Sequence, residues 1–263
     1  MQAQAKAIRS FHNRIKTDLL QRFGQAQTCT TLLDVGVGRG GDIMKWYNAG
    51  IHNVVGLDVE PEYVKEAVRR YRQAKLNAHT KYKFHVIKSN DTFITTLQKN
   101  DLPMQYDIVS CQFCLHYFAS SEEHLHEFFR SVSNVLKPNG VFVGTVPCGS
   151  SIIELLDGNA EFSNDQVLIK KNCDSLSPQC GDSIQFSMTG TLYFGESMVS
   201  HEFLVYKDLV QYIAMNYGLK LIEWKSFSEY HYDDTFNLSS ASKTASFINK
   251  TFVFKKRLCT AFD

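Results

Sequence analysis

The sequence predicts an α/β protein built on a doubly wound sheet with an inserted β-rich segment. Three observations favour this fold class. A short apolar run over 32–35 leads directly into a glycine-rich turn. Apolar runs of strand length then alternate with amphipathic runs of helical length, which is the pattern of strands joined by helical crossovers. Between about residues 150 and 200 polar residues interrupt this alternation, so we expect an insertion on the substrate side of the sheet.

The expected helices follow from the spacing of apolar residues and from helix-start signals. Apolar residues recur at helical spacing from Ile8 to Phe23. Pro61 stands where a helix tolerates a missing N–H, and Ser120 or Ser121 is a suitable N-cap. We therefore expect helices over 5–23, from 43 onwards, over 61–73, from 120 or 121 to 136, and over 207–217.

The expected strands are apolar or alternating runs bounded by turn residues. They lie at 32–35, 54–58, 82–87, 106–111, 141–146, 219–224 and 247–255. The insertion contains short β-like runs at 167–169, 184–186 and 192–194. The run over 201–205 is expected to rejoin the core, and 226–246 is expected to be a polar connection. One domain over 1–263 accounts for the chain, and its early start suggests that it is cut from a longer polypeptide.

The composition is that of a globular protein without a global affinity for nucleic acid. Hydrophobic residues make up 44% and charged residues 21%, and the net charge is +1, so any nucleic-acid contact must be local. No apolar run is long enough for a membrane span, and the first residues lack a signal core. Cys111 and Cys114 have C-x-x-C spacing without a second pair, so packing is expected rather than zinc binding. The 7 cysteines suit a reducing compartment.

The glycine-rich turn predicts a site for a nucleotide-like ligand. Glycines at 36, 38, 40 and 41 let the backbone approach a ligand closely, at the corner where doubly wound sheets bind nucleotides. The spacing departs from the G-x-G-x-x-G pattern of dinucleotide sites. Instead, Asp34 precedes the turn and Asp58 ends the next strand. Two acids suit a ligand with an ammonium group and a ribose but no pyrophosphate, as in S-adenosylmethionine. An NAD site and a bare structural turn are the alternatives.

Four further segments hold candidate ligand contacts, each with a structural alternative. Lys16 either meets a ligand carboxylate or belongs to the polar face of a packed helix. Asp91 either accepts from an adenine amino group or caps a turn. The basic helix over 61–73 either contacts phosphate or is a solvated face. The segment 112–118 lies at a strand end where such sheets place ligands, although its histidine, His116, is otherwise a packed residue.

Several of these segments together carry a family resemblance. They are 11–16, 33–42, 112–118, 144–147 and 201–205. Over nearly its whole length the chain resembles the messenger-RNA cap guanine-N7 methyltransferases. Within that family it looks most like the methyltransferase domains of capping enzymes of large cytoplasmic DNA viruses, of the asfarvirus kind. Two positions depart from the usual pattern on the cap side, because His12 stands for an asparagine and Asn249 for a tyrosine.

The resemblance implies a Rossmann-like class I methyltransferase fold with S-adenosylmethionine as methyl donor and no metal. On the donor side, Lys16 would bind the carboxylate, Asp34 with Gly36 and Gly38 the amino-acid end, Asp58 the ribose and Asp91 the adenine, while Gln112 would line the pocket. On the cap side, Arg39 and Arg70 would contact the triphosphate, His116 and Tyr117 the guanine, Pro147 the cap and Glu202 the base. The implied partner is the capped 5′ end of RNA (GpppN). The resemblance also implies other capping domains in the same polypeptide, and no interaction with a membrane is expected. The implied location is the cytoplasm, either the host cytoplasm or the virion.

The implied reaction needs no general base. Guanine N7 has a free lone pair and no proton to lose, so methyl transfer from sulfur to N7 requires alignment rather than proton transfer. The resemblance assigns that alignment, and the stabilisation of charge on the base, to His116, Tyr117 and Glu202. Two alternatives stay open, namely a methyltransferase that acts on a small molecule and a non-catalytic subunit that binds the donor.

Overall fold

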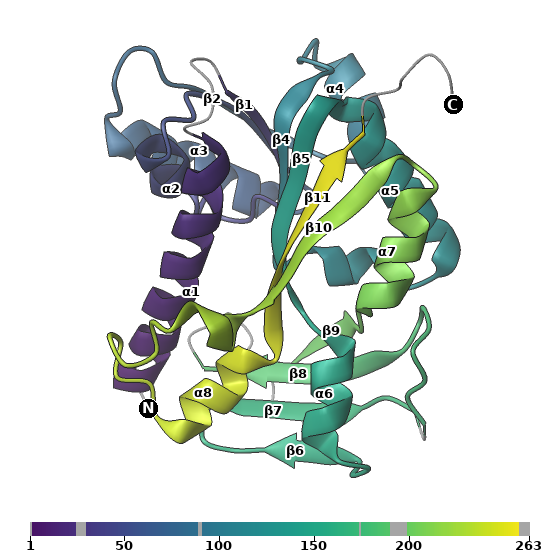
Figure 1. Cartoon of the computed structure of the whole chain (residues 1–263). Coiled ribbons are helices and arrows are strands. Elements are labelled where there is room, and N and C mark those ends of the chain that lie inside the picture. Colours follow the sequence, from purple (N-terminus) through teal and green to yellow (C-terminus); the bar gives the residue numbers. More distant parts are fainter. Residues whose placement is uncertain (1, 25–29, 89–90, 174, 190–198, 258–263) are drawn as a thin grey trace.

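Two sheets organise the chain, whose computed structural model describes residues 2–24, 30–88, 91–173, 175–189 and 199–257 (Figure 1). The larger sheet has seven strands. In spatial order they are β10 (Leu219–Ser226), β11 (Asn249–Lys256), β5 (Leu136–Pro147), β4 (Tyr106–Gln112), β1 (Thr31–Val35), β2 (Asn53–Asp58) and β3 (Lys81–Val86). This order confirms the predicted doubly wound sheet.

The strand directions create one switch point in the larger sheet. β1 to β5 run parallel, whereas β11 runs antiparallel to both β5 and β10. From β1 the chain crosses to β2 and β3 on one side, and it then returns to β4 and β5 on the other. A sheet of this kind binds ligands beyond the carboxyl ends of its strands where the winding reverses, which here is between β1 and β4.

Helices cover both faces of the larger sheet (Figure 1). One face carries α1 (Gln2–Gly24), α2 (Ile43–Asn48) and α3 (Pro61–Ala74), and the other carries α4 (Phe93–Lys99), α5 (Glu122–Val135) and α7 (Lys207–Met215). Each helix turns its apolar residues inward. The fully buried Trp46 of α2 and Phe129 of α5 are examples, one on each side of the sheet. Among the described residues, no helix is both long and apolar enough to cross a bilayer.

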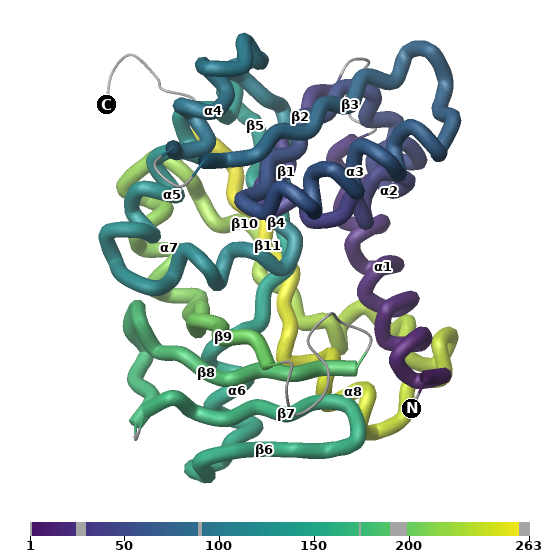
Figure 2. The backbone as a smooth tube through the Cα atoms, turned by 180° about the vertical axis from the view of Figure 1, so that it is seen from behind, coloured from purple at the N-terminus to yellow at the C-terminus, as the bar shows by residue number. Residues whose placement is uncertain are grey.

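A second, antiparallel sheet lies below the first with its own core. Its strands are β6 (Glu161–Ser163), β7 (Val167–Lys171), β8 (Ser183–Met188) and β9 (Ser200–Phe203), accompanied by α6 (Gly149–Leu156) and α8 (Ser240–Phe247). Figure 2 shows this sheet from behind, with α1 running from beside it up to α2 and α3. The first half of α1 packs Ile8, Phe11 and Ile15 into the lower core, and Leu19 and Leu20 pack into the upper one. Helix α1 therefore ties the two sheets together.

The structure confirms one sequence-based expectation and corrects another. The run over 201–205 rejoins the core as expected, because Leu204 and Val205 are fully buried, although its first residues belong to β9 at the edge of the smaller sheet. The stretch 226–246 is not a bare connection. It contains the 3-10 helix η2 (Phe227–Tyr230) and most of α8, because Phe227 and Ala245 fill the lower core.

Other boundaries differ in detail. The sequence did not predict helix α4, because this segment has few apolar positions. Phe247 is the last residue of α8, whereas the sequence placed it at the start of the last strand. The insertion begins with a helix, α6, before its hairpin strands. The β-like run over 192–194 lies outside the described residues. Cys111 is buried in the core on the face of the larger sheet that α5 covers, and Cys114 packs against that core, as the packing interpretation expects.

Gly144 marks the tightest packing at the centre of the larger sheet. It lies in β5, between Cys111 on β4 and Phe252 on β11. A β-carbon at this position would overlap the carbonyl oxygen of Cys111 and lie 2.5 Å from Cζ of Phe252. Glycine at 144 therefore lets two neighbouring groups occupy the space that a side chain would need.

We predict that Gly144→Ala destabilises the fold. Overpacking of this kind lowers the free energy of unfolding by about 1–3 kcal/mol, which denaturant titration followed by circular dichroism would measure. Gly41→Ala is the matched control, because a β-carbon there meets nothing within 4 Å. Equal stability of the two variants would show that β4 and β11 move apart to admit the methyl group.

Candidate active site

The candidate site begins at the glycine turn after β1. The backbone N–H groups of Gly36 and Val37 donate to the carbonyl oxygen of Leu57 at 2.8 and 2.9 Å, which fastens the turn to β2. Gly36 has a φ of +80°, and a side chain there would overlap Cys114. Gly38 has a φ of +53°, and a β-carbon added there would meet nothing within 4 Å. The turn is therefore packed against Cys114 at Gly36, whereas at Gly38 it has open space in which a ligand could approach the backbone.

Asp34 is a buried carboxylate with an unused oxygen. It lies in β1 between Gly56 and Ser110 of the neighbouring strands, and its Oδ1 has no hydrogen-bond partner among the described residues. Burial, and then the charge of Asp42, raise the pKa of Asp34 to about 7, although Ser110 and Lys16 act in the opposite direction. Buried polar atoms are nearly always bonded, so Oδ1 marks a place for a cationic or hydrogen-bonding ligand group.

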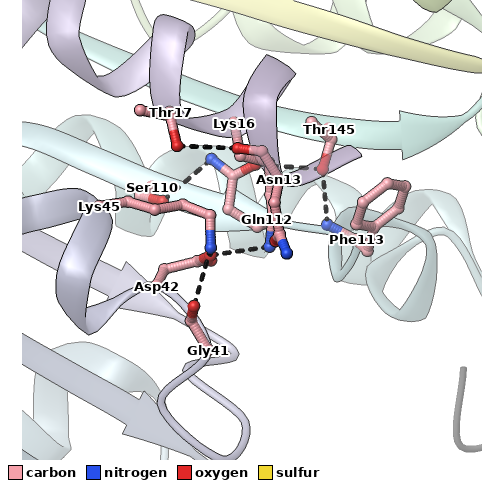
Figure 3. Close-up of polar contacts among 10 residues, drawn as sticks. All are labelled: Asn13, Lys16, Thr17, Gly41, Asp42, Lys45, Ser110, Gln112, Phe113 and Thr145. Carbon is pink, nitrogen blue, oxygen red and sulfur yellow. Dashed lines mark hydrogen bonds and ion pairs between the residues drawn. The ribbon is translucent and has the colours of Figure 1, made fainter. Parts of the chain in front are cut away.

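Asp42 is a second buried carboxylate, and two lysines hold it (Figure 3). Lys16 from α1 and Lys45 from α2 each place Nζ 2.8 Å from Oδ1 of Asp42. Burial by itself raises the pKa of Asp42, but the two ammonium groups outweigh it and hold the pKa at about 2. Asp42 is therefore ionised and paired with two cations, whereas Asp34 forms no ion pair among the described residues.

The end of β4 is fixed by hydrogen bonds to β5 (Figure 3). Gln112 donates from Nε2 to Oγ of Ser110 at 3.2 Å and accepts from Oγ1 of Thr145 at 3.1 Å. The N–H of Phe113 donates to the carbonyl oxygen of Thr145 at 2.9 Å. Phe113 has a φ of +54°, which is uncommon for a bulky residue and costs free energy of order 1–3 kcal/mol. Such strain is typical of functional sites.

Two predicted donor contacts have partners within the protein. Asp58 accepts from the N–H of Gly38 at 2.7 Å and from the N–H of Glu60 at 3.0 Å, so it braces the glycine turn. Asp91 forms an ion pair with Lys99 at 2.6 Å. The preceding residues 89 and 90 lie outside the described part of the chain.

His116 and Glu202 meet across the two sheets. His116 belongs to the 3-10 helix η1 (Leu115–Phe118) after β4, and Glu202 belongs to β9. Nε2 of His116 lies 4.0 Å from Oε2 of Glu202, and Oε1 of Glu202 accepts from Oγ of Ser200 at 2.7 Å. Neither ring nitrogen of His116 has a hydrogen-bond partner among the described residues. The neighbouring Tyr117 is 46% exposed, with its ring centre 4.1 Å from that of His116.

Burial sets the charges of this pair. It lowers the pKa of His116 to about 3, so the imidazole is neutral at physiological pH. Burial also raises the pKa of Glu202 to about 7, against the hydrogen bond from Ser200. The pair therefore offers a neutral imidazole and a carboxyl group that ionises near neutral pH, both with unfilled hydrogen-bonding capacity.

The two residues that depart from the usual pattern, His12 and Asn249, meet at one serine. Nε2 of His12 lies 3.1 Å from Oγ of Ser246, and Nδ2 of Asn249 donates to the carbonyl oxygen of Ser246 at 2.9 Å. The ring of His12 stacks on that of Phe113, with centres 5.6 Å apart. Asn249 lies opposite Pro147 in the β5–β11 pairing. Both departures are thus accommodated as buried, hydrogen-bonded residues.

Both arginines that were predicted to contact the triphosphate are exposed. The Arg39 guanidinium lies over the ring of Tyr63, 4.9 Å from its centre. Nε of Arg70 donates to Glu66 at 2.8 Å on the exposed surface of α3. The structure therefore brings together Lys16 with Asp42, Gly38 with Asp58, and His116 with Glu202, whereas it ties Arg70 to its own helix and Asp91 to Lys99.

Sequence reasoning assigned no role to Lys45, Ser110 or Thr145. Lys45 had a usable signal, because it follows Asp42 by three residues at the start of a helix, where such pairs face each other. Ser110 and Thr145 had none, since each is a small polar residue within an apolar strand whose partner depends on strand pairing.

A model of the mRNA (guanine-N(7))-methyltransferase domain matches residues 2–256. The chain belongs to this family. It is 31% identical over 229 residues to an mRNA cap guanine-N(7) methyltransferase of Schizosaccharomyces pombe, which covers 84% of this chain and 61% of that protein. It is 30% identical over 231 residues to mRNA cap guanine-N(7) methyltransferase 1 of Oryza sativa, covering 85% of this chain and 61% of that protein. The chain thus spans about six tenths of these relatives.

Solved structures agree on the fold. A putative S-adenosylmethionine-dependent methyltransferase from Listeria monocytogenes superposes with a TM-score of 0.62 at 14% identity, over 95% of this chain and 99% of that one. The CcbJ methyltransferase from Streptomyces caelestis superposes with a TM-score of 0.60 at 14% identity, over 94% and 90% of the two chains. The domain therefore has the class I methyltransferase fold, as the sequence predicts.

We predict that Asp34→Asn stabilises the ligand-free domain in a pH-dependent way. The pKa of Asp34, about 7 in the folded state, exceeds the value of about 3.9 expected in the unfolded chain. Raising the pH therefore favours the unfolded state, which ionises more readily. The stability gained by the variant should grow from near zero at pH 4 to a plateau above pH 7, of up to about 4 kcal/mol.

Thermal and denaturant unfolding across this pH range would measure the difference. Asp165→Asn, at an exposed position, is the matched control. A difference that does not change with pH would contradict the assignment of Asp34 as a buried, poorly compensated acid.

Proposed function

We propose that this domain is an mRNA cap guanine-N7 methyltransferase, which transfers a methyl group from S-adenosylmethionine to N7 of the guanosine cap. The observation that carries the proposal is a set of buried polar atoms without partners, at the carboxyl ends of adjacent strands. Oδ1 of Asp34 lies just before the glycine turn on one side, and both ring nitrogens of His116 lie opposite Glu202 on the other. A cationic donor and a purine would supply the missing partners.

The donor side fits S-adenosylmethionine in charge and shape. The ammonium group suits the free oxygen of Asp34, and the carboxylate suits Lys16, the more exposed of the two lysines on Asp42. The open face of Gly38 admits the ligand beside Asp58, which we assign to the ribose. Asp91 is assigned to the adenine, and Gln112 to the pocket wall. The donor supplies an electrophilic methyl group on a sulfonium.

The cap side fits a purine that gains positive charge. We assign His116 and Tyr117 to the guanine, Pro147 to the cap, and Glu202 to hydrogen bonding of the base. Because N7 becomes positively charged when it accepts the methyl group, a fixed carboxylate nearby stabilises the transition state. Arg39 and Arg70 are assigned to the triphosphate, and Arg70 would exchange Glu66 for phosphate oxygen.

The chain's own residues then act by alignment. No proton leaves N7 on attack, so no side chain is required as a base. Holding N7 in line with the methyl group and sulfur contributes about 7–11 kcal/mol in well-oriented systems. Lys16 and Asp34 fix the donor, and His116 and Glu202 fix the acceptor.

Incubation with labelled S-adenosylmethionine and unmethylated capped RNA, followed by nuclease digestion, tests the proposal. Label recovered on N7 of the cap guanine supports it. Label on a small molecule added in competition, or donor binding without any transfer, would favour the small-molecule methyltransferase or the non-catalytic subunit instead.

We predict that Glu202→Gln lowers kcat/KM for capped RNA by about a hundredfold or more, because it removes the carboxylate charge beside the base. Donor affinity, measured by calorimetry, should stay nearly unchanged. Glu154→Gln, at an exposed position on α6, is the matched control. Full activity of Glu202→Gln would mean that Glu202 does not contact the cap.

We also predict that Asp34→Asn abolishes detectable donor binding in calorimetry, because the neutral amide cannot compensate the ammonium group. Wild-type affinity should rise with pH up to about 7, as Asp34 ionises, by about tenfold per unit at most. Unchanged affinity in the variant would remove Asp34 from the donor site.

The partners follow from the substrate. Capped RNA must first be made by transfer of a guanylyl group to an RNA 5′ end, so we propose that this domain acts beside other capping activities, in the same polypeptide. The resemblance to viral capping enzymes also leads us to propose a viral origin and a cytoplasmic location, in the host cell or the virion. The five cysteines in the described part of the chain are free thiols, which agrees with a reducing compartment.

A further inference from the structure

Lys45 is a buried cation at the donor site whose role the proposed reaction leaves open. Its side chain is 10% exposed, and its Nζ lies 2.8 Å both from Oδ1 of Asp42 and from the carbonyl oxygen of Gly41. Figure 3 shows the ammonium group between these two acceptors, beside Lys16. Burying an ammonium group is costly unless it is paired, so its position calls for a reason.

The same carboxylate oxygen serves two lysines from different helices. Lys16 reaches Oδ1 of Asp42 from α1 and Lys45 reaches it from α2, each at 2.8 Å. Within the described residues, Asp42 is the only acid that forms an ion pair with Lys16. An ammonium group has three donors, so Lys16 keeps hydrogen-bonding capacity beyond this pair.

The charge of the cluster depends on Lys45. Lys16, Lys45 and Asp42 together carry one net positive charge, whereas Lys16 and Asp42 alone would be neutral. A ligand carboxylate is attracted more strongly to Lys16 when the negative charge of Asp42 is also balanced by Lys45. This electrostatic attraction is large where water is excluded. Lys45 thus determines how much attraction Lys16 can offer a second carboxylate.

We propose that Lys45 is a positioning residue that takes up part of the charge of Asp42, so that Lys16 can bind the carboxylate of the methyl donor. This inference rests on the proposed function for the donor site only and does not depend on the acceptor. It assigns Lys45 no contact with the donor. Its hydrogen bond to Gly41 holds the ammonium group at the end of the glycine turn, where its charge acts on Asp42.

A purely structural role for Lys45 predicts a different result. If Lys45 only fastens the end of the glycine turn through Gly41, its loss should weaken every ligand that uses the turn, with or without a carboxylate. The two roles are separated by comparing S-adenosylmethionine with its decarboxylated analogue, which keeps the sulfonium, the amine, the ribose and the adenine.

Calorimetric titration of Lys45→Gln with both ligands is the test. The affinity for S-adenosylmethionine divided by the affinity for the analogue should fall about tenfold relative to wild type. A hydrogen bond or ion pair with a charged group contributes about a factor of ten to affinity. The analogue itself should bind nearly as before. Lys65→Gln, at a 78% exposed position on α3, is the matched control. An equal loss for both ligands, or no loss, would overturn the proposal.

Two further variants keep the test decisive if Lys45→Gln is unstable. Asp42→Asn makes the net charge of the cluster more positive. The affinity of this variant for S-adenosylmethionine relative to the analogue should therefore be higher than that of wild type. Combining Asp42→Asn with Lys45→Gln returns the net charge to that of wild type and should restore the ratio. If the affinity ratio does not change with the net charge of the cluster in these variants, the inference is overturned. Failure of capped RNA to accept a methyl group, with donor binding intact, would instead count against the proposed acceptor.

Discussion

The ion pair between Lys16 and Asp42 is the contact on which the site depends. It joins helix α1, from the first residues of the chain, to the glycine turn after β1, and both side chains are almost fully withdrawn from water. The same helix packs into both cores. Because breaking a buried pair leaves an uncompensated charge, this contact holds α1 against the segment that follows the glycine turn.

Asp34 and Asp42 flank the glycine turn, and their pKa values are shifted in opposite directions because only Asp42 is paired with lysines. Both are buried, and burial raises the pKa of each. Asp42 has two lysines within 2.8 Å and stays ionised, whereas Asp34 has an oxygen without a partner among the described residues. The protein thereby neutralises the charge of one carboxylate internally and leaves that of the other for a ligand, so that environment gives two identical residues different roles.

The acceptor side depends on the meeting of two sheets. His116 follows a strand of the larger sheet, and Glu202 lies on the edge strand of the smaller one. Their 4.0 Å approach requires that β9 lies beside η1, where Leu115 and Phe118 share one hydrophobic cluster with Phe203 of β9. A change in the packing of the smaller sheet would therefore alter the acceptor side before it altered the glycine turn.

The sequence by itself determined the doubly wound sheet, the glycine turn with Asp34 and Asp58, and the family resemblance. These features are local, since strand and helix periodicity and the turn residues lie within a few positions of one another. Only the tertiary structure decided that β9 belongs to a second sheet, that Lys16 reaches Asp42, and that His116 meets Glu202. Those outcomes depend on contacts between residues far apart in the chain, such as Lys16 with Asp42 and His116 with Glu202, and no local pattern records which distant charge a buried side chain will meet.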